Sequence, residues 1–204
     1  MAKTSGSNIG KTGGFSITDV NYKGKIIDVQ PLSSIKHNDV FREIKQGISK
    51  YHSRLGVRQR DVKLAGLENN VNGVHVTKDG ESSNIYLNNK VFNRKMNEIV
   101  NRTKKSYDNG WSTKTNKPIQ HTIVHELAHA TWNSHLTSPK AKAAGIEIAK
   151  LHKSWLVDTK KSGYGEYSKA NINEFWAETT TKSILGKSDR YTRKVKSIIK
   201  KYKL

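Results

Sequence analysis

Three residues near the middle of the chain have types and a spacing that suit metal-dependent hydrolysis. His125, Glu126 and His129 follow the order H-E-x-x-H within the stretch PIQHTIVHELAHATWNSH at 118–135. On a helix, residues four apart lie one above the other, so both imidazoles could bind one metal ion. Glu126 is turned to the side of such an ion, where a base could take a proton from a metal-bound water. The alternative is a core helix that carries two histidines by chance.

A second stretch, YSKANINEFWAE at 167–178, could supply the remaining ligand. Glu174 and Glu178 are four residues apart, so on a helix they share one face. One carboxylate could bind the metal while the other accepts a hydrogen bond from a ligand imidazole. A purely structural alternative is a helix cap formed by Asn171 with Glu174. The chain has no cysteine, so zinc would need nitrogen and oxygen ligands.

A helix is expected to carry the H-E-x-x-H motif. Asn116 or Thr115 can cap it, and Pro118 suits its first turn. His121 lies four residues before His125 on the same face, and we expect it to form a wall of the site or to support a ligand. An apolar stripe runs beside the histidine face and comprises Ile119, Ile123, Val124, Leu127, Ala128 and Thr131.

The stretches before the motif predict a small sheet and two helices. Apolar residues recur at helical spacing from Asn38 onward, and residues 93–107 form a second, basic helical pattern. Between them, the runs VKLAG, GVHVT and NIYLNNKVF are typical of strands, and a turn at 78–80 joins the last two as a hairpin. The alternation of Val74 and Val76 predicts that both face the core and that His75 faces solvent. A short strand is also expected at 25–29.

The stretches after the motif predict three more helices. One opens at Ser138-Pro139, one carries Glu174 and stops near Gly186, and the last runs from Ser188 to Leu204. The fold class is therefore α+β: a small twisted mixed sheet packed on the H-E-x-x-H helix, with further helices toward the C-terminus. Residues 1–20 have little to bury and suggest a flexible leader, and 21–204 suit a single domain.

The charge is strongly positive. Lys and Arg number 37 against 17 Asp and Glu, which gives a net charge of +20. Such an excess suits nucleic acid, an anionic surface or an acidic substrate, or it serves only as a solubilising surface. No 18-residue apolar run and no apolar N-terminal segment occur, so neither a membrane span nor a signal peptide is expected. A cytoplasmic or particle-packaged protein fits these features best.

The two motifs together resemble those of zincin metallopeptidases in which H-E-x-x-H is followed by a glutamate on a later helix, the gluzincin-like pattern. HELAHA at 125–130 and the tract at 167–178 are similar to motifs in the peptidase domain of anthrax lethal factor and its relatives. The separation of 45 residues between His129 and Glu174 is also similar to the separation in that family. The lead-in GWSTKTNKPIQ at 110–120 is similar to metallopeptidase domains of phage minor head and polyvalent proteins. The resemblance covers roughly the last hundred residues and suggests a phage or prophage product.

The resemblance implies a role for each matching position. His125, His129 and Glu174 would bind Zn²⁺, Glu126 would be the base, and Tyr167 would stabilise the transition state. Glu178 would support a ligand imidazole. One departure is Ala128, where relatives often have glycine, and nothing in the chain resembles the toxin's other domains. The implied activity is hydrolysis of a protein or peptide substrate. The alternatives are a basic virion or nucleic-acid-associated protein whose zinc is structural, and a toxin or anti-host effector protease.

Overall fold

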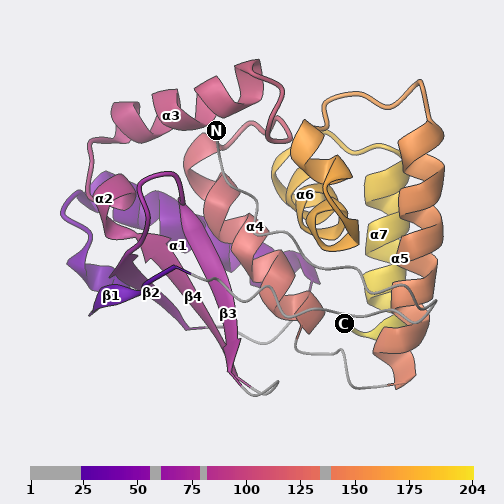
Figure 1. Cartoon of the computed structure of the whole chain (residues 1–204), viewed down its shortest axis with the longest axis horizontal. Helices are drawn as coiled ribbons and strands as arrows, with labels where there is room; N and C mark the ends of the chain where they lie inside the picture. Colours follow the sequence, from indigo (N-terminus) through magenta and orange to yellow (C-terminus); the bar gives the residue numbers. More distant parts are fainter. Residues whose placement is uncertain (1–23, 56–60, 79–81, 134–138) are drawn as a thin grey trace.

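The computed structural model describes residues 24–55, 61–78, 82–133 and 139–204 (Figure 1). The expected leader at 1–20 and the turn residues 79 and 80 lie outside these ranges. Within them the chain forms a four-stranded sheet, seven α-helices and two short 3-10 helices. The strands are β1 Ile27–Pro31, β2 Val62–Gly66, β3 Gly73–Lys78 and β4 Ser82–Asn88. The helices are α1 Asn38–Leu55, α2 Asn89–Phe92, α3 Met96–Asp108, α4 Pro118–Asn133, α5 Pro139–Val157, α6 Ile172–Leu185 and α7 Arg190–Tyr202, with η1 at Leu32–Ser34 and η2 at Glu166–Lys169.

The sheet is mixed and has the strand order β1-β2-β4-β3. β2 runs parallel to β4, while β1 and β3 pair antiparallel with β2 and β4. The pairing of β3 with β4 confirms the expected hairpin partners. β3 is an outer strand of this sheet, so one of its edges is not paired with another described strand. The architecture is the α+β class expected from the sequence.

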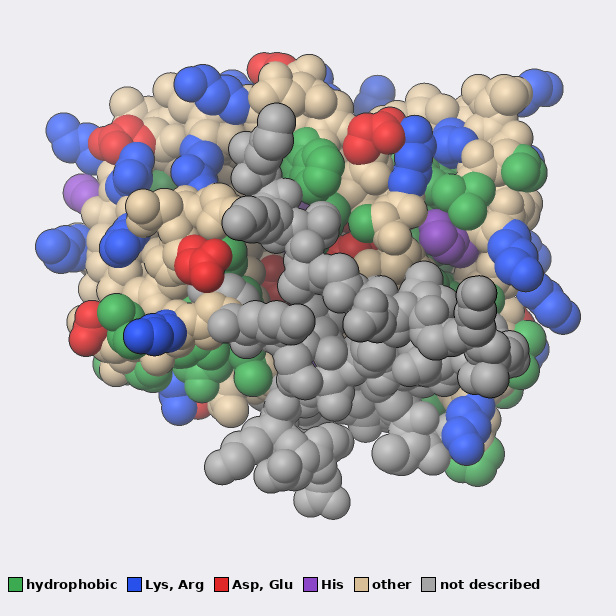
Figure 2. Space-filling view, viewed as in Figure 1, with side chains coloured by type: hydrophobic (Ala, Val, Ile, Leu, Met, Phe, Trp, Pro, Cys, Tyr) green, Lys and Arg blue, Asp and Glu red, His purple; other side chains and the backbone are tan. Residues whose placement is uncertain are grey.

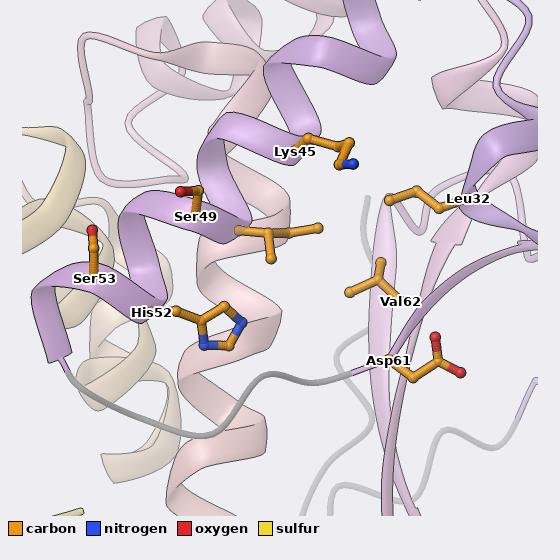
Figure 3. Close-up of a pocket in the computed structure, with 8 residues that line it drawn as sticks. Leu32, Lys45, Ser49, His52, Ser53, Asp61 and Val62 are labelled. Atoms are coloured by element: carbon orange, nitrogen blue, oxygen red, sulfur yellow. The ribbon is translucent and has the colours of Figure 1, made fainter.

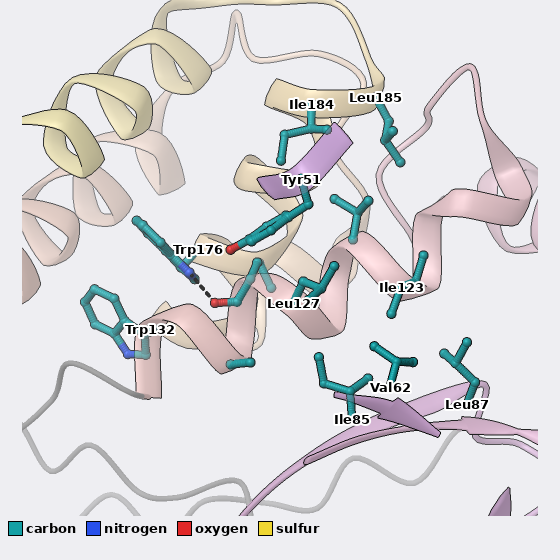
Figure 4. Close-up of a cluster of buried hydrophobic side chains, with 14 of the residues drawn as sticks. Tyr51, Val62, Ile85, Leu87, Ile123, Leu127, Trp132, Trp176, Ile184 and Leu185 are labelled. Atoms are coloured by element: carbon teal, nitrogen blue, oxygen red, sulfur yellow. Dashed lines mark hydrogen bonds between the residues drawn. The ribbon is translucent and has the colours of Figure 1, made fainter. Parts of the chain in front are cut away.

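α4 packs across one face of the sheet and is the central element of the core. Val62, Ile85 and Leu87 point from the strands toward Ile123 and Leu127 of α4 (Figure 4). All five side chains are nearly or fully buried. Burial of such side chains is worth about 1.5–3 kcal/mol each, so this interface contributes strongly to stability and fixes the position of the H-E-x-x-H helix.

α1 contacts α4 closely. An added Cβ on Gly47 of α1 would lie 3.0 Å from Ile123 Cγ2, so the small residue permits the close approach. Further along the same contact, the buried Tyr51 hydroxyl donates to Thr131 Oγ1 at 2.6 Å. Both contacts hold α4 from the side away from its histidines.

The sheet corrects one expectation about a histidine. His75 pairs with Ile85 across the hairpin, and Val74 pairs with Tyr86. Side chains alternate along a strand, so His75 shares the α4-facing side with Ile85 and is 4% exposed, whereas Val74 and Val76 lie on the opposite side and are half-buried. The prediction that His75 faces solvent is therefore wrong.

Two element boundaries also differ from the expectations. The run NIYLNNKVF does not continue as a strand to its end, because Asn88 Oδ1 accepts from Lys90 N and caps α2. The first strand begins at Ile27 rather than Lys25. The helices predicted to begin near 38, 118 and 139, the helix that carries Glu174 and stops near Gly186, and those at 93–107 and 188–204 are all present. Each end that was predicted agrees to within about three residues.

Candidate metal centre

The candidate site lies between α4 and α6, which pack side by side (Figure 1). The indole of Trp176 on α6 donates to the carbonyl of Ala128 on α4 at 2.9 Å, and both residues are fully buried. This contact fixes the two helices where α4 presents its histidines and α6 its glutamates. Ala128, the departure from the family pattern, thus faces α6.

Three buried side chains meet at one point. His125 Nε2 lies 3.1 Å from His129 Nε2 and 3.2 Å from Glu174 Oε2, and His129 Nε2 lies 3.3 Å from the same oxygen. Ligand atoms about 2.0–2.1 Å from a tetrahedral ion lie about 3.3 Å from one another. Glu174 Oε2 is buried and has no well-aligned hydrogen-bond donor among the described residues. The three atoms therefore fit a metal ion.

Glu178 lies behind this triangle and faces the opposite nitrogen of His125. Its Oε1 is 3.0 Å from His125 Nδ1 and 3.5 Å from His121 Nε2, and its Oε2 accepts from the backbone N–H of Thr113 at 2.7 Å. A carboxylate in this place holds an imidazole with Nε2 aimed at the metal. His121, His125 and Glu178 also form a second group close enough to hold an ion. Glu178 Oε1 is closer to His125 than to His121. We therefore describe Glu178 as a residue that supports His125 in the first group.

His121 is itself held by a polar chain from α3. The Tyr107 hydroxyl lies 3.1 Å from His121 Nδ1 and 2.9 Å from Thr115 Oγ1, and all three residues are buried. The structure thus places His121 next to Glu178 rather than at the ligand triangle. Its role as a wall of the site or as support for a ligand stays a prediction.

The electrostatics of the cluster couple its acids to its imidazoles. Burial would raise the pKa of Glu174, but His129 and His125 hold that pKa well below its usual range. For Glu178, burial is likewise outweighed by His121 and His125, which keep its pKa low. Burial opposes the charge of His125, but Glu174 and Glu178 raise its pKa well above the ordinary value. Without a metal ion, the cluster is therefore stabilised by positive imidazole against negative carboxylates.

Glu126 behaves differently from these two glutamates. Burial raises the pKa of Glu126, and the neighbouring His125 and His129 oppose that rise only in part. Its carboxylate accepts a hydrogen bond from the backbone of His75 on β3. A Cβ on Gly73 would lie 2.9 Å from Thr122 Cγ2 and 3.2 Å from Glu126 Cγ, so glycine lets the strand approach α4 here. Glu126 stands beside the ligand triangle, between α4 and the outer strand.

Tyr167 covers the other side of His125. Its ring stacks on His125 with centroids 5.8 Å apart and on Trp111 with centroids 5.4 Å apart. Burial, followed by the charges of Glu174 and Glu126, raises the pKa of Tyr167 well above its usual value, so its hydroxyl stays protonated. Tyr167 can therefore donate a hydrogen bond, and its side chain makes one with the Glu174 carboxylate.

Residues 110–113 connect Tyr167 with Glu178. Tyr167 N donates to Trp111 O at 2.9 Å, and Thr113 N donates to Glu178. An added Cβ on Gly165 would lie 2.2 Å from Trp111 O, so only glycine fits at this crossing. The sequence alone had not identified Thr113, Trp111, Gly165 or Tyr107, because their roles depend on contacts between segments more than 10 residues apart.

Asn171 has the capping role that the sequence left as the structural alternative. Its side-chain oxygen accepts from Asn173 N and Glu174 N, both at 2.9 Å, and begins α6. This cap fixes the first turn of the helix, and the first turn contains Glu174. Asn171 therefore acts on the site through the backbone of Glu174.

A separate hollow between α1 and the sheet has no residue of this cluster in its wall (Figure 3). Its volume is about 630 Å³, and it includes His52, Lys45 and Asp61. His152 lies elsewhere again, stacked on Phe175 with centroids 4.8 Å apart. Among the described residues, neither histidine belongs to a group of side chains that could hold a metal ion.

Comparison with family models, with curated proteins and with solved structures found no match. None of the described helices is long and apolar enough to cross a membrane. The function must therefore be inferred from the geometry of the cluster and from the resemblance of its motifs.

Proposed function

We propose that the chain is a zinc-dependent endopeptidase of the gluzincin-like zincin type. The observation that carries this proposal is the triangle of His125 Nε2, His129 Nε2 and Glu174 Oε2, with atoms 3.1–3.3 Å apart and a carboxylate oxygen without a well-aligned donor among the described residues. Two imidazoles and one carboxylate are a ligand set of catalytic zinc, which leaves a position for water or substrate. The motif resemblance points the same way.

The chain's own residues divide the chemistry between them. Bound zinc would act as a Lewis acid and make water acidic near neutral pH. Glu126 would take a proton from the attacking water and pass it to the leaving amine, and burial helps here because it moves the carboxyl pKa toward neutrality. Tyr167, kept protonated, would donate to the oxyanion that forms on the substrate carbonyl. Glu178 would hold His125 in the orientation that zinc binding requires.

A peptide is the substrate class that the surroundings favour. Glu126 lies against the backbone of β3, an outer strand of the sheet. Extended peptides bind such edges by adding a strand through main-chain hydrogen bonds. A peptide aligned on β3 would pass the carboxylate of Glu126. A phage or prophage origin and a place in the particle or the host cytoplasm follow from the resemblance alone.

The decisive experiment compares the parent with Glu126→Gln on a random peptide library. The parent, with about one zinc per chain, should cleave peptides, and the variant should keep its zinc and lose at least about 100-fold in kcat/KM. Glu98→Gln on the exposed side of α3 is the matched control, and its activity should be unchanged. Zinc-replete parent protein that cleaves neither the library nor lysate proteins would favour a structural zinc site in a basic virion protein.

A further inference from the structure

α5 and α7 pack side by side at the edge of the molecule, across α6 from the metal cluster (Figure 1). Figure 2 shows Lys and Arg side chains along the edge where α5 lies. We call the solvent-facing side of these two helices the basic face. Its exposed cations are Lys140, Lys142, Lys150, Lys153, Lys160, Lys187, Arg190, Arg193, Lys194, Lys196, Lys200, Lys201 and Lys203.

The acids in the same stretches are occupied in joining the helices to their neighbours. Asp158, at the end of α5, contacts Arg190 at 2.7 Å and accepts from the Tyr191 hydroxyl at 2.8 Å. Glu147 contacts Lys201 and accepts from the Tyr202 hydroxyl at 2.6 Å. Residues 139–160 and 187–203 hold one further acid, Asp189, which caps α7 and contacts Lys182 of α6. These acids stabilise the packing of α7, and most cations of the basic face have no acid beside them in these stretches.

The exposed positions of α7 have a regular arrangement. Arg193, Lys196 and Lys200 are spaced by three or four residues and so form one row on α7, while Tyr191, Val195, Ile198 and Ile199 are buried on the other side. Lys203, which caps the C-terminal end of the helix, is counted with them. The helical part of the row is about 10 Å long, since a helix rises about 1.5 Å per residue. A DNA duplex carries one negative charge about every 1.7 Å of its axis, so the row can face several phosphates.

From this arrangement we infer that the basic face binds the phosphate backbone of nucleic acid without regard to base sequence. The observation that favours nucleic acid over a membrane surface is the composition of α7. Its exposed side chains are Lys and Arg with one serine, Ser197, and they include no apolar group that could enter a bilayer. The exposed large apolar side chains Ile146, Leu156 and Val157 lie on α5, so the case for nucleic acid is made for α7. The face offers no aromatic stack to read or hold bases, so its affinity would come from counterion release.

The test measures binding of a duplex of about 20 base pairs and mixed sequence as a function of salt concentration. In the row variant, Arg193, Lys196, Lys200 and Lys203 are all changed to Gln. The slope of log affinity against log salt should become less steep by about 3.6 relative to the parent if each of the four cations contacts one phosphate, because each lost contact removes about 0.9. Circular dichroism and thermal unfolding establish that the variant is folded.

A matched variant separates the row from net charge. Lys36, Arg42, Lys104 and Lys105 on the other half of the molecule are also exposed, and changing them to Gln removes the same four charges. Its slope should fall by less than about 1. Equal losses in the two variants, or a parent that fails to bind the duplex at low salt, would overturn the inference. Binding to anionic phospholipid vesicles but not to duplex would overturn it in favour of a membrane surface.

Binding by this face is independent of the proposed peptidase activity. Glu126→Gln should bind duplex with the affinity of the parent, because Glu126 lies between α4 and β3. Conversely, the row variant should cleave peptides as well as the parent does. The comparison of duplex binding stands whichever way the peptidase experiment turns out, because it does not use cleavage as its readout.

Discussion

Two helix pairs of this chain use their polar residues in opposite ways. In the pair α4 and α6, the side chains from Ile119 to Trp132 and from Asn173 to Leu185 are buried, including five histidines and glutamates of the cluster. In the pair α5 and α7, the buried side chains are mostly apolar and the charges lie outside. The division of α7 into an apolar and a charged side is what a helix needs in order to pack at the surface of a protein.

Packing does not explain in the same way why α4 and α6 bury ionisable side chains. Buried ionisable groups cost free energy unless they are paired or bind a metal, and replacement by apolar residues often stabilises a fold. α4 and α6 nevertheless bring His121, His125, His129, Glu174 and Glu178 into one interior cluster. Departures from local packing rules occur mainly at functional sites, so this contrast makes α4 and α6 the candidate functional half of the helical region.

The largest loss of zinc affinity is expected on removal of Glu174, a buried carboxylate of the pair α4 and α6. Glu174→Ala removes one apex of the triangle, so zinc affinity should fall by more than about 100-fold, beyond the usual effect of a residue that only supports a ligand. Zinc content after dialysis against a weak chelator measures this. Glu147→Ala on α5 is the control, and a Glu174→Ala protein that keeps zinc as tightly as the parent would show that the third ligand is another residue.

The next effect concerns turnover rather than metal binding. Tyr167→Phe keeps the stacking on His125 and Trp111 but removes the hydroxyl, so kcat should fall by roughly 10²–10³-fold with zinc content unchanged. Steady-state kinetics on a peptide found in the library experiment provide the measurement. Tyr86→Phe on β4 serves as the control. A loss of zinc together with activity would instead show that Tyr167 acts by shaping the metal site.

The sequence predicted the helices that carry the candidate site because its signals are local. The four-residue spacings of His125 with His129 and of Glu174 with Glu178 place side chains on one face of a helix, whatever the tertiary fold. In the structure, the histidine face of α4 and the glutamate face of α6 lie against each other. The identity of a metal and the activity stay predictions.

The features that the sequence did not reveal depend on contacts between distant segments. The interpretation of β3 assumed that its valines face the core, but an outer strand is covered less completely, and His75 takes the α4-facing side next to Glu126. Similarly, the N–H of Thr113 meets a carboxylate 65 residues away, and no periodicity signals such a partner. The position of Gly165 against Trp111 is visible only once both loops are placed.

A smaller effect is expected at Glu178. Glu178→Gln keeps the size of the side chain and its contact with Thr113 but weakens the hold on His125, so zinc affinity or activity should fall about 10 to 100-fold. Isothermal titration of the metal-free protein with Zn²⁺ gives the affinity. Glu166→Gln, exposed on η2, is the control. If Glu178→Gln matched Glu174→Ala in severity, Glu178 would have to be a ligand itself, as in the second group with His121.

The smallest effect is expected on stability, at the contact between α6 and α7 that connects the two helix pairs. Asp189 caps α7 and contacts the buried ammonium of Lys182 on α6 at 2.8 Å. Burial would raise the pKa of Asp189, but Lys182 and the backbone N–H of Thr192 hold it below its usual range. The folded state therefore binds this proton less readily than the unfolded chain. The stabilisation is present above the unfolded pKa of about 3.9 and is lost as pH falls through the folded pKa.

Asp189→Asn keeps a capping oxygen but removes the ion pair with Lys182. At about pH 6 the free energy of unfolding should fall by about 1–2 kcal/mol, between the values for exposed and buried pairs. The difference between parent and variant should shrink as pH falls from about 5 toward 3, because the parent then loses the same charge. Urea unfolding of both proteins across this range measures it, with Asp108→Asn at the exposed end of α3 as the control. A difference in the free energy of unfolding that does not change with pH would mean that Asp189 stabilises the contact between α6 and α7 through its cap alone. The two helix pairs would then be connected by apolar packing rather than by charge.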